Sequence, residues 1–146
     1  MKKIILITSV YTGHGHKSIS DSLVEQFADM PDTDVNVVDG FELLGDFGVQ
    51  LSKLYGPTTR YARQFWKVGW HLSDHHDGLM KQSISTLSHN RFQRLMAEYR
   101  PDLILTVHSM FNGSVLKLLK SCGMDDIPLV TLQADTVWSP LVTISA

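Results

Sequence analysis

The first thirty residues constrain the fold most, because a short apolar run leads through a glycine-histidine turn into an amphipathic helix. Residues 4–10 are mostly apolar and rich in β-branched side chains, which is typical of a strand buried on both faces. Leu23, Val24 and Phe27 follow at three- and four-residue spacing, which indicates one buried face of a helix. The segment therefore predicts a strand, a turn and a helix, with the turn at the carboxyl end of the strand.

The turn between these two elements is suited to an anionic group. Gly13 and Gly15 allow a ligand to approach the backbone amides closely, and the helix start offers unpaired N–H groups with a partial positive charge. The third glycine of the dinucleotide-binding fingerprint would fall on Ser18, and Lys17 lacks the glycine frame of a Walker loop. The turn therefore matches neither nucleotide-binding motif, and we expect it to bind a phosphate or another anionic headgroup.

Two histidines flank Gly15 in this turn. His14 and His16 would both stand at the carboxyl end of the first strand. An imidazole titrates near neutral pH and can accept a proton from a hydroxyl group, so a base is available at this edge of the sheet. His16 is favoured because it lies closer to the helix amino terminus, where the positive end of the helix dipole favours a neutral ring. The alternative for His16 is a capping or packing role at the helix start.

Apolar runs and amphipathic segments alternate along the chain. We expect strands near residues 3–9, 34–39, 102–107 and 128–133, and helices near 17–29, 42–55, 58–72, 80–98 and 112–122. Apolar strands separated by helices predict an α/β fold, a Rossmann-like parallel sheet with helices on both faces. An ordinary crossover needs a single helix, so the helical stretch at about 41–98 is expected to be an insertion with a functional role.

Polar residues follow the apolar strands and should converge at one edge of the sheet. If the second and third strands lie on opposite sides of the first, the crevice between strands one and three is the expected ligand site. His14 and His16 end the first strand, His108 and Asn112 the third, and Asp135 the fourth. Each has an alternative: His108 would cap the next helix, Asn112 is a still better helix cap than a ligand group, and Asp135 would cap a turn.

Residues 53–71 carry basic and aromatic side chains and no acidic one. On a helix the cations share one face and the tryptophans the other, which is typical of a helix in a membrane interface. The alternative is a buried aromatic stripe. The residues expected to contact a membrane are Arg60, Arg63, Trp66, Lys67 and Trp70.

Composition indicates an intracellular domain without general affinity for nucleic acid. The net charge is −2 and the isoelectric point is about 6.4, so no overall attraction to a polyanion is implied. The single cysteine, Cys122, excludes an internal disulfide, and we expect it to fill space before the helix stop at Gly123. No apolar run reaches the roughly 20 residues that span a bilayer, and no signal peptide is expected.

The sequence gives little support for a metal site. His14 and His16 are only two residues apart, and no cysteine or paired carboxylate lies near them in the sequence to complete a usual ligand set. Residues 75–77, His-His-Asp, could add ligands, but such a cluster in a polar loop is more often a solvated turn. We therefore expect no bound metal.

Three segments together resemble the monogalactosyldiacylglycerol synthase and processive diacylglycerol glucosyltransferase family. Residues 13–20 resemble its Gly-X-Gly-His motif and the small residues that follow. Residues 100–112 resemble its Lys/Arg-Pro-Asp, apolar strand and histidine, and residues 127–135 resemble its apolar strand ending in aspartate. The three segments occur in the family's order and span almost the whole chain.

This resemblance implies the amino-terminal half of a GT-B glycosyltransferase that transfers a hexose from a UDP-sugar to diacylglycerol or a glycolipid with inversion. It places the motif histidine at His16, the implied base, and gives Asp135 a second role in orienting it. No resident cofactor is implied, since the UDP-sugar is a co-substrate bound mainly by the other domain. The residues implied to bind the acceptor are Gly13, His14, Gly15, Lys17, Ser18, His108 and Asp135.

At 146 residues the chain has the length of one domain, and we expect it to be the acceptor-binding half alone, inactive without a carboxyl-terminal sugar-nucleotide domain. Its expected partners are the acceptor lipid, an anionic membrane surface and that domain. The expected location is cytoplasmic, peripheral on the inner face of the cell membrane. Two alternatives stay open: a half-enzyme for another lipid acceptor, and a non-catalytic membrane-binding subunit that recruits a separate donor-binding chain.

Overall fold

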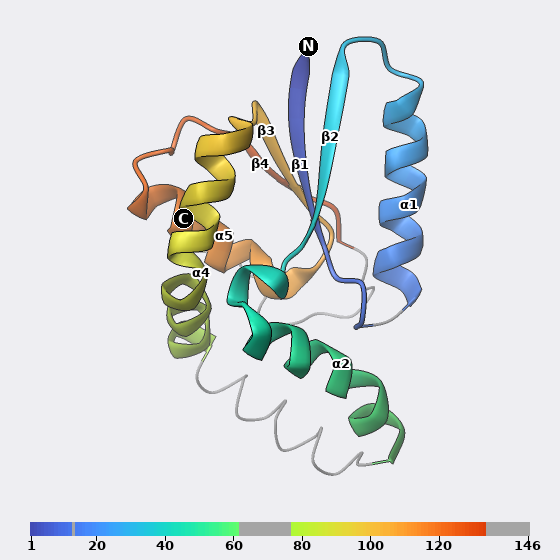
Figure 1. The fold of residues 1–146 in the computed structure, drawn as a ribbon, viewed down its shortest axis with the longest axis vertical. Helices are drawn as coiled ribbons and strands as arrows, with labels where there is room; N and C mark the ends of the chain where they lie inside the picture. The colour runs from blue at the N-terminus through green and yellow to red at the C-terminus, as the bar shows by residue number, and fades with distance from the viewer. Residues whose placement is uncertain (13, 62–76, 134–146) are drawn as a thin grey trace.

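A four-stranded parallel sheet forms the centre of the molecule (Figure 1). The computed structural model describes residues 1–12, 14–61 and 77–133. The strands are β1 (Lys2–Thr8), β2 (Thr33–Asp39), β3 (Leu103–Thr106) and β4 (Leu129–Thr131). They lie in the order β2-β1-β3-β4, and their ends differ from the expected ones by at most two residues. The predicted Rossmann-like parallel sheet is therefore confirmed.

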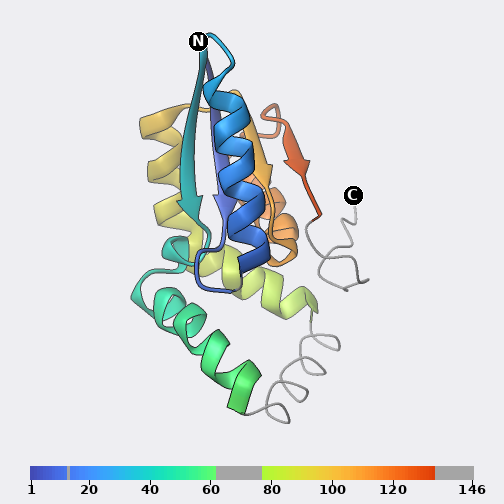
Figure 2. The same ribbon diagram turned by 90° about the vertical axis from the view of Figure 1, so that its right-hand side faces the viewer.

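Helices connect the strands on both faces of the sheet. They are α1 (His14–Ala28), the short 3-10 helix η1 (Glu42–Leu44), α2 (Asp46–Tyr61), α4 (Asp77–Tyr99) and α5 (Ser109–Ser121). Figures 1 and 2 show α1 on one face of the sheet and α4 with α5 on the other. The chain therefore passes through η1, α2 and α4 between β2 and β3, where the sequence predicted a helical insertion.

The two faces of the sheet bury separate apolar clusters, because successive side chains of a strand point to opposite sides. Ile4 and Leu6 of β1 pack with Leu105 and Val107, and the α1 side chains Ile19, Leu23 and Phe27 cover this cluster. Ile5 and Ile7 belong to the larger cluster on the opposite face, which includes Phe41, Phe92, Met96, Phe111, Val115, Leu118 and Leu119. The central strand is thus buried on both faces, as its apolar run predicted.

The first helix begins at His14, three residues before the start that we expected. The preceding loop is closed by a hydrogen bond from the Thr12 hydroxyl to the Ser9 hydroxyl at 2.5 Å. Because the loop is so short, the histidine turn is itself part of the first turn of α1. Ser18, which we expected near the helix start, lies inside the helix instead.

The break that we expected near Pro57 is absent, because α2 continues through this residue. A proline in a helix removes one backbone donor and leaves carbonyl groups of the preceding turn without a partner. Here the Thr58 hydroxyl lies 2.5 Å from the carbonyl oxygen of Leu54 and 3.1 Å from that of Tyr55. Neither carbonyl is that of Lys53, whose backbone donor Pro57 removes, so the Thr58 hydroxyl adds contacts to the preceding turn and does not replace the lost hydrogen bond.

The carboxyl end of α5 follows the sequence prediction. Cys122 is the C-cap, is half-buried and packs against the larger apolar cluster. Gly123 follows with a φ of 66°, in the left-handed region that glycine adopts without strain. The cysteine therefore has the space-filling role that we expected.

The strand order puts the carboxyl ends of β1 and β3 next to each other. β1 pairs with β2 along one side and with β3 along the other, both in parallel. The chain therefore leaves β1 and β3 toward opposite faces, which creates the crevice where open α/β sheets bind ligands. Figures 1 and 2 show α2 beyond these strand ends, so the insertion lies at the same edge of the sheet.

Gly40, directly after β2, provides a test of the packing at this edge. A Cβ atom on Gly40 would overlap the ring of Phe111, which is 2% exposed. Gly40→Ala should therefore lower the free energy of unfolding by about 1–3 kcal/mol in urea denaturation, the usual cost of overpacking a core. Gly56→Ala is the matched control: apart from its chain neighbours and the backbone of its own helix, a Cβ there meets no atom within 4 Å, so the change should cost less than Gly40→Ala. Equal effects of the two changes would contradict this account.

Candidate functional site

Asp39, the last residue of β2, organises the loops at the carboxyl edge of the sheet. It is 6% exposed, and its two carboxylate oxygens accept hydrogen bonds from different loops. One oxygen accepts from the Phe41 amide at 2.9 Å, and the other accepts from the Val10 amide at 3.3 Å. Asp39 therefore ties the loop after β1 to the turn after β2. Our sequence analysis missed this residue, although an aspartate followed by glycine at a strand end is a recognisable turn signal.

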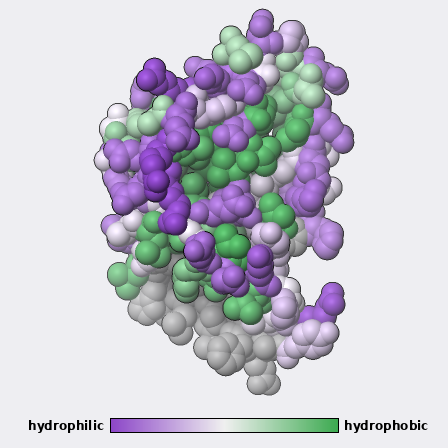
Figure 3. All heavy atoms as spheres, in the orientation of Figure 1, coloured by the Kyte–Doolittle hydropathy of each residue, from purple (hydrophilic) through white to green (hydrophobic). Residues whose placement is uncertain are grey.

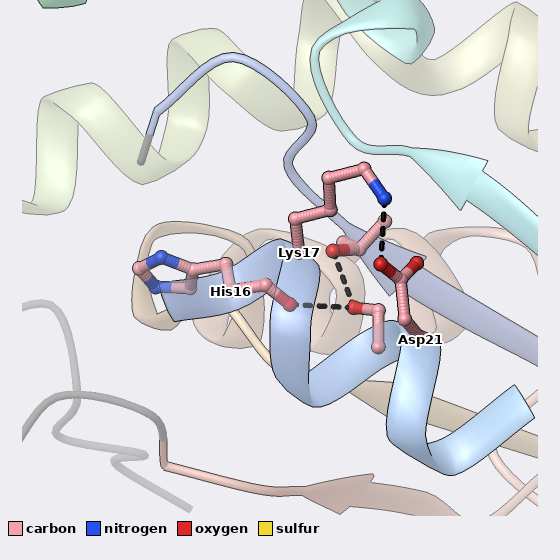
Figure 4. Close-up of polar contacts among 5 residues, drawn as sticks. His16, Lys17 and Asp21 are labelled. Atoms are coloured by element: carbon pink, nitrogen blue, oxygen red, sulfur yellow. Dashed lines mark hydrogen bonds and ion pairs between the residues drawn. The ribbon is translucent and has the colours of Figure 1, made fainter. Parts of the chain in front are cut away.

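His16 lies in the first turn of α1, on its buried side, and is 8% exposed. One turn later, the Ser20 hydroxyl donates to the His16 carbonyl oxygen at 2.8 Å and lies 2.6 Å from the Thr8 hydroxyl at the end of β1. Figure 4 shows the His16 ring pointing away from Lys17 and Asp21. The residue is therefore held at the end of the central strand while its ring extends toward the crevice.

The ring of His16 stacks on the ring of His108. The two ring centroids are 4.3 Å apart, and the ring planes differ by 23°. His16 follows β1 and His108 follows β3, so residues 92 positions apart in the sequence meet at the point where the strand order reverses. The sequence predicted that these two histidines converge, and the structure confirms it.

His108 is the N-cap of α5 and is half-buried. Its Nδ1 atom accepts a hydrogen bond from the Met110 amide at 3.2 Å. Burial, and in second place the nearby His16, lower the pKa of His108 from 6.5 to about 3. A neutral imidazole that accepts at Nδ1 carries its proton on Nε2, so the cap also determines the tautomer.

Asn112 does not cap a helix, contrary to one of our expectations. It lies in the first turn of α5 and is 1% exposed, and its Oδ1 atom accepts a hydrogen bond from the Thr106 hydroxyl at 2.6 Å. The same hydroxyl lies 3.1 Å from the hydroxyl of Thr131 in β4. The helix begins three residues earlier than expected, so His108 occupies the cap position and Asn112 links α5 to the sheet.

The other predicted site residues of α1 face away from the His16 ring. Successive helix residues are rotated by about 100°, so His14 and His16 project to nearly opposite sides of α1. His14, Gly15, Lys17 and Ser18 are exposed, and the Lys17 ammonium forms an ion pair with Asp21 at 2.6 Å. The predicted site residues that the structure describes therefore divide into the stacked pair His16 and His108 and an exposed group on other sides of α1.

An open pocket of about 460 Å³ lies on the exposed side of α1. The described residues that line it are Val10, Tyr11, His14, Lys17, Tyr55, Gly56 and Arg60. Lys17 and Arg60 are cations, and none of these lining residues is acidic. The pocket joins the histidine turn to the carboxyl-terminal part of α2, but His16 and His108 are not in its lining set. The pocket is thus adjacent to the histidine pair rather than around it.

Several predicted residues lie outside the described part of the chain. These are Gly13, Arg63, Trp66, Lys67, Trp70 and Asp135. Of the residues that we expected to contact a membrane, only Arg60 is described, and it is exposed and lines the pocket. The roles of all these residues therefore stay predictions.

The outward face of α2 is apolar, which the sequence analysis did not foresee. Phe47, Leu51, Leu54 and Tyr61 are 68%, 48%, 56% and 83% exposed. Their spacing of four, three and seven residues puts them on one side of the helix. Figure 3 shows hydrophobic surface over α2 in the lower half of the view. We call Phe47, Leu51, Leu54 and Tyr61 the outer α2 face.

Two absences apply to the described residues. Over residues 1–12, 14–61 and 77–133, no three histidine, cysteine, aspartate or glutamate side chains are grouped so that they could hold a metal ion. In the same ranges, no helix is long and apolar enough to cross a membrane.

The low pKa of His108 predicts how stability changes with pH. As pH falls below 6.5, the unfolded chain takes up a proton at His108 that the folded chain does not bind, so the folded state becomes less stable. This contribution should cost up to roughly 1.5 kcal/mol between pH 6.5 and pH 5. His108→Asn keeps a side-chain cap and removes the titration, so urea denaturation should show a smaller loss in this variant. An equal loss in both proteins would contradict the assignment.

Comparison with known proteins agrees with the motifs. The family model for monogalactosyldiacylglycerol (MGDG) synthase matches residues 16–138. The processive diacylglycerol beta-glucosyltransferase of Staphylococcus saprophyticus is 28% identical over 137 residues, which cover 92% of this chain and 34% of that protein. The chain therefore spans about a third of the length of this curated relative. No solved structure matches. Because the family model covers most of the chain, from the histidine turn past β4, the chain belongs to the monogalactosyldiacylglycerol synthase family.

Proposed function

We propose that this chain is the acceptor-binding half of a glycosyltransferase that transfers a hexose from a UDP-sugar to diacylglycerol with inversion. The family match supports glycolipid synthesis, and the similar protein is named a processive diacylglycerol beta-glucosyltransferase. The 34% coverage of that protein supports a division of labour, in which a further domain binds the UDP-sugar. On this proposal residues 1–146 alone transfer no sugar, because a base without a positioned donor loses the contribution of orientation.

The observation that carries the proposal is the position of His16. Its ring lies at the switch point of the sheet, where a ligand in an α/β fold is expected. Only 8% of the residue is exposed, so a substrate hydroxyl would reach one edge of the ring in a largely dry environment. An oriented imidazole that accepts a proton from a hydroxyl group is a general base.

In the proposed reaction, a hydroxyl oxygen of the acceptor attacks the anomeric carbon of the UDP-sugar as His16 accepts the hydroxyl proton. The bond from the anomeric carbon to the UDP oxygen breaks, and UDP leaves with the bonding electrons. Attack from the opposite side inverts the anomeric centre. The exposed group His14, Gly15, Lys17 and Ser18, with the pocket beside it, would bind a phosphate or another anionic headgroup of the surrounding lipid, since diacylglycerol has no headgroup beyond the hydroxyl that has to reach His16.

The outer α2 face supports binding to a membrane surface. An acceptor such as diacylglycerol stays in the bilayer, so the enzyme must bring its site to the lipid. Leu51 and Leu54 extend away from the protein on a helix that also borders the basic pocket. Lys53 and Arg60 of the same helix would meet anionic headgroups while the apolar side chains enter the interface. We therefore propose peripheral attachment through α2, on the inner face of the cell membrane.

His16→Ala tests the catalytic assignment. In the protein that combines this chain with a sugar-nucleotide domain, the change should lower the rate of sugar transfer to diacylglycerol by roughly 100-fold or more, the scale of a lost general base. His14→Ala is the matched control, since it removes the same side chain from the exposed side of the same helical turn, and it should have a smaller effect. Labelled UDP-sugar and diacylglycerol liposomes give the measurement.

Two results of this assay would reject the proposal. Full activity of the His16→Ala protein would exclude His16 as the base. Robust sugar transfer by residues 1–146 alone would exclude the division into two halves. Complete inactivity of the combined protein, with the liposome binding described below intact, would instead favour the non-catalytic membrane-binding subunit.

A double change, Leu51→Glu with Leu54→Glu, tests the proposed membrane face. It should weaken sedimentation with anionic liposomes by roughly tenfold or more, because each buried leucine contributes on the order of 1.5 kcal/mol or more of apolar transfer free energy. Leu87→Glu on α4 is the matched control, since Leu87 is 55% exposed and Leu54 is 56% exposed. The melting temperatures of all three proteins should agree, and equal liposome binding by the double variant and the control would exclude this face.

A further inference from the structure

The two stacked histidines at the crevice are held in different ways. His108 is fixed through its own ring, since Nδ1 accepts from the Met110 amide at 3.2 Å. Figure 4 shows the backbone carbonyl oxygen of His16 accepting a hydrogen bond from the Ser20 hydroxyl, at 2.8 Å. The His16 ring itself stacks on the His108 ring, with a centroid distance of 4.3 Å and an angle of 23° between the ring planes.

Two phenylalanines contact the His108 ring. The Phe111 ring lies 5.5 Å from it, and the Phe41 ring meets it edge-on at 6.2 Å and 87°. Phe41 and Phe111 also contact each other edge-on, at 5.2 Å and 83°. Both phenylalanines are almost completely buried, at 4% and 2% exposure. We call Phe41, His108 and Phe111 the aromatic platform.

The backbone around the platform allows it little room to move. The backbone amide of Phe41 donates a hydrogen bond to the buried Asp39 carboxylate at 2.9 Å, which fixes the position of Phe41. Gly40 leaves the space that the Phe111 ring occupies, since a Cβ there would overlap that ring. Phe111 and His108 are both fixed by the start of α5, where the Phe111 amide donates to the His108 carbonyl oxygen at 3.1 Å. The platform is therefore built from the ends of β2 and β3, independently of α1.

We propose that His108 is a positioning residue: its ring, held by the helix cap and the aromatic platform, fixes the orientation in which the His16 ring faces the substrate. The inference rests on the proposed function only for its effect on sugar transfer. Burial and the nearby His16 lower the pKa of His108 to about 3, so the His108 ring is neutral near pH 7 and places no positive charge against His16. A positioned base gains from orientation, and a displacement of about 1 Å can cost about 100-fold in rate.

Substitutions at position 108 can separate the stack from the cap. His108→Phe keeps a flat ring for stacking and loses the acceptor for the Met110 amide. His108→Asn keeps a side-chain acceptor at the cap position, where asparagine is a favoured residue, and loses the ring. Each variant therefore keeps one of the two roles of His108, stacking or capping, and loses the other.

The proposal predicts different results for the two variants. His108→Asn should stay folded and lower kcat for sugar transfer by about 10-fold to 100-fold, with KM for the acceptor unchanged. His108→Phe loses the cap and should lower the melting temperature, but it keeps a ring for the stack and should lower kcat less than His108→Asn does. A KM effect in place of a kcat effect would indicate direct contact between His108 and the acceptor, and would overturn the proposal.

A spectroscopic measurement tests the orientation without any assay of activity. Ring signals of His16 in histidine-labelled protein are identified by their loss in His16→Gln. These signals should move in His108→Asn, since the ring stack is removed, and should stay close to their parent positions in His108→Phe. Unchanged His16 ring signals in a folded His108→Asn protein would overturn the proposal.

The two measurements keep this inference separate from the proposed reaction. If His16→Ala does not reduce sugar transfer but the His16 signals respond to His108→Asn, then His16 is not the base and the orienting contact stands. If His16→Ala abolishes transfer while His108→Asn changes neither kcat nor the His16 signals, then the reaction stands and the positioning role of His108 is excluded.

Discussion

Parallel pairing of β1 with both β2 and β3 is the constraint on which the candidate site depends. Since all three strands run in the same direction, their carboxyl ends meet at one edge, and the loops that follow them have to share that edge. Asp39, the last residue of β2, accepts a hydrogen bond from the loop after β1, and His108, after β3, stacks on His16, after β1. Each strand end therefore holds the next one in place. The pair of histidines is a consequence of strand order, and no local sequence motif could have produced it.

The sheet was predictable because its strands are short apolar runs between clear turn signals, and burial of β1 on both faces leaves little ambiguity about its direction. The errors arose where a local signal was overruled. Pro57 would end an isolated helix, but α2 continues through it. Similarly, α1 begins at His14 because the Ser9 and Thr12 hydroxyl groups close a very short loop before it. Such outcomes depend on local geometry and are not contained in periodicity.

The candidate site was only partly predictable for a related reason. The residue types and the switch point indicated that His16 and His108 converge, and the structure agrees. Sequence alone could not show that His14 and Lys17 face the opposite side of α1, because that depends on the residue at which the helix begins. It also could not identify the outer α2 face: Phe47, Leu51 and Leu54 have the spacing of a buried stripe, and only the packing of α2 shows that they are exposed.

The Arg-Pro-Asp segment has a different role from the one expected of a site motif. The Asp102 carboxylate accepts a hydrogen bond from the Lys3 amide at 2.8 Å, at the edge of the sheet far from the histidines. Part of the sequence pattern that resembles the family therefore stabilises the sheet and does not belong to the candidate site.

Residues in the first turn of α1 face two different environments. This arrangement requires that the rotation of the helix about its own axis is fixed. His16 and Ser20 face the sheet and are buried, whereas His14 and Lys17 face the open pocket. A proton acceptor needs a fixed, dry position, and a headgroup needs an accessible, polar one. The 100° rotation per residue separates the two over a single turn. Ile19, Leu23 and Phe27 pack on the sheet from the same side of α1 as His16, so their burial sets the rotation of the helix. The apolar face of α1 is therefore what holds the proposed base and the pocket residues on different sides of the helix.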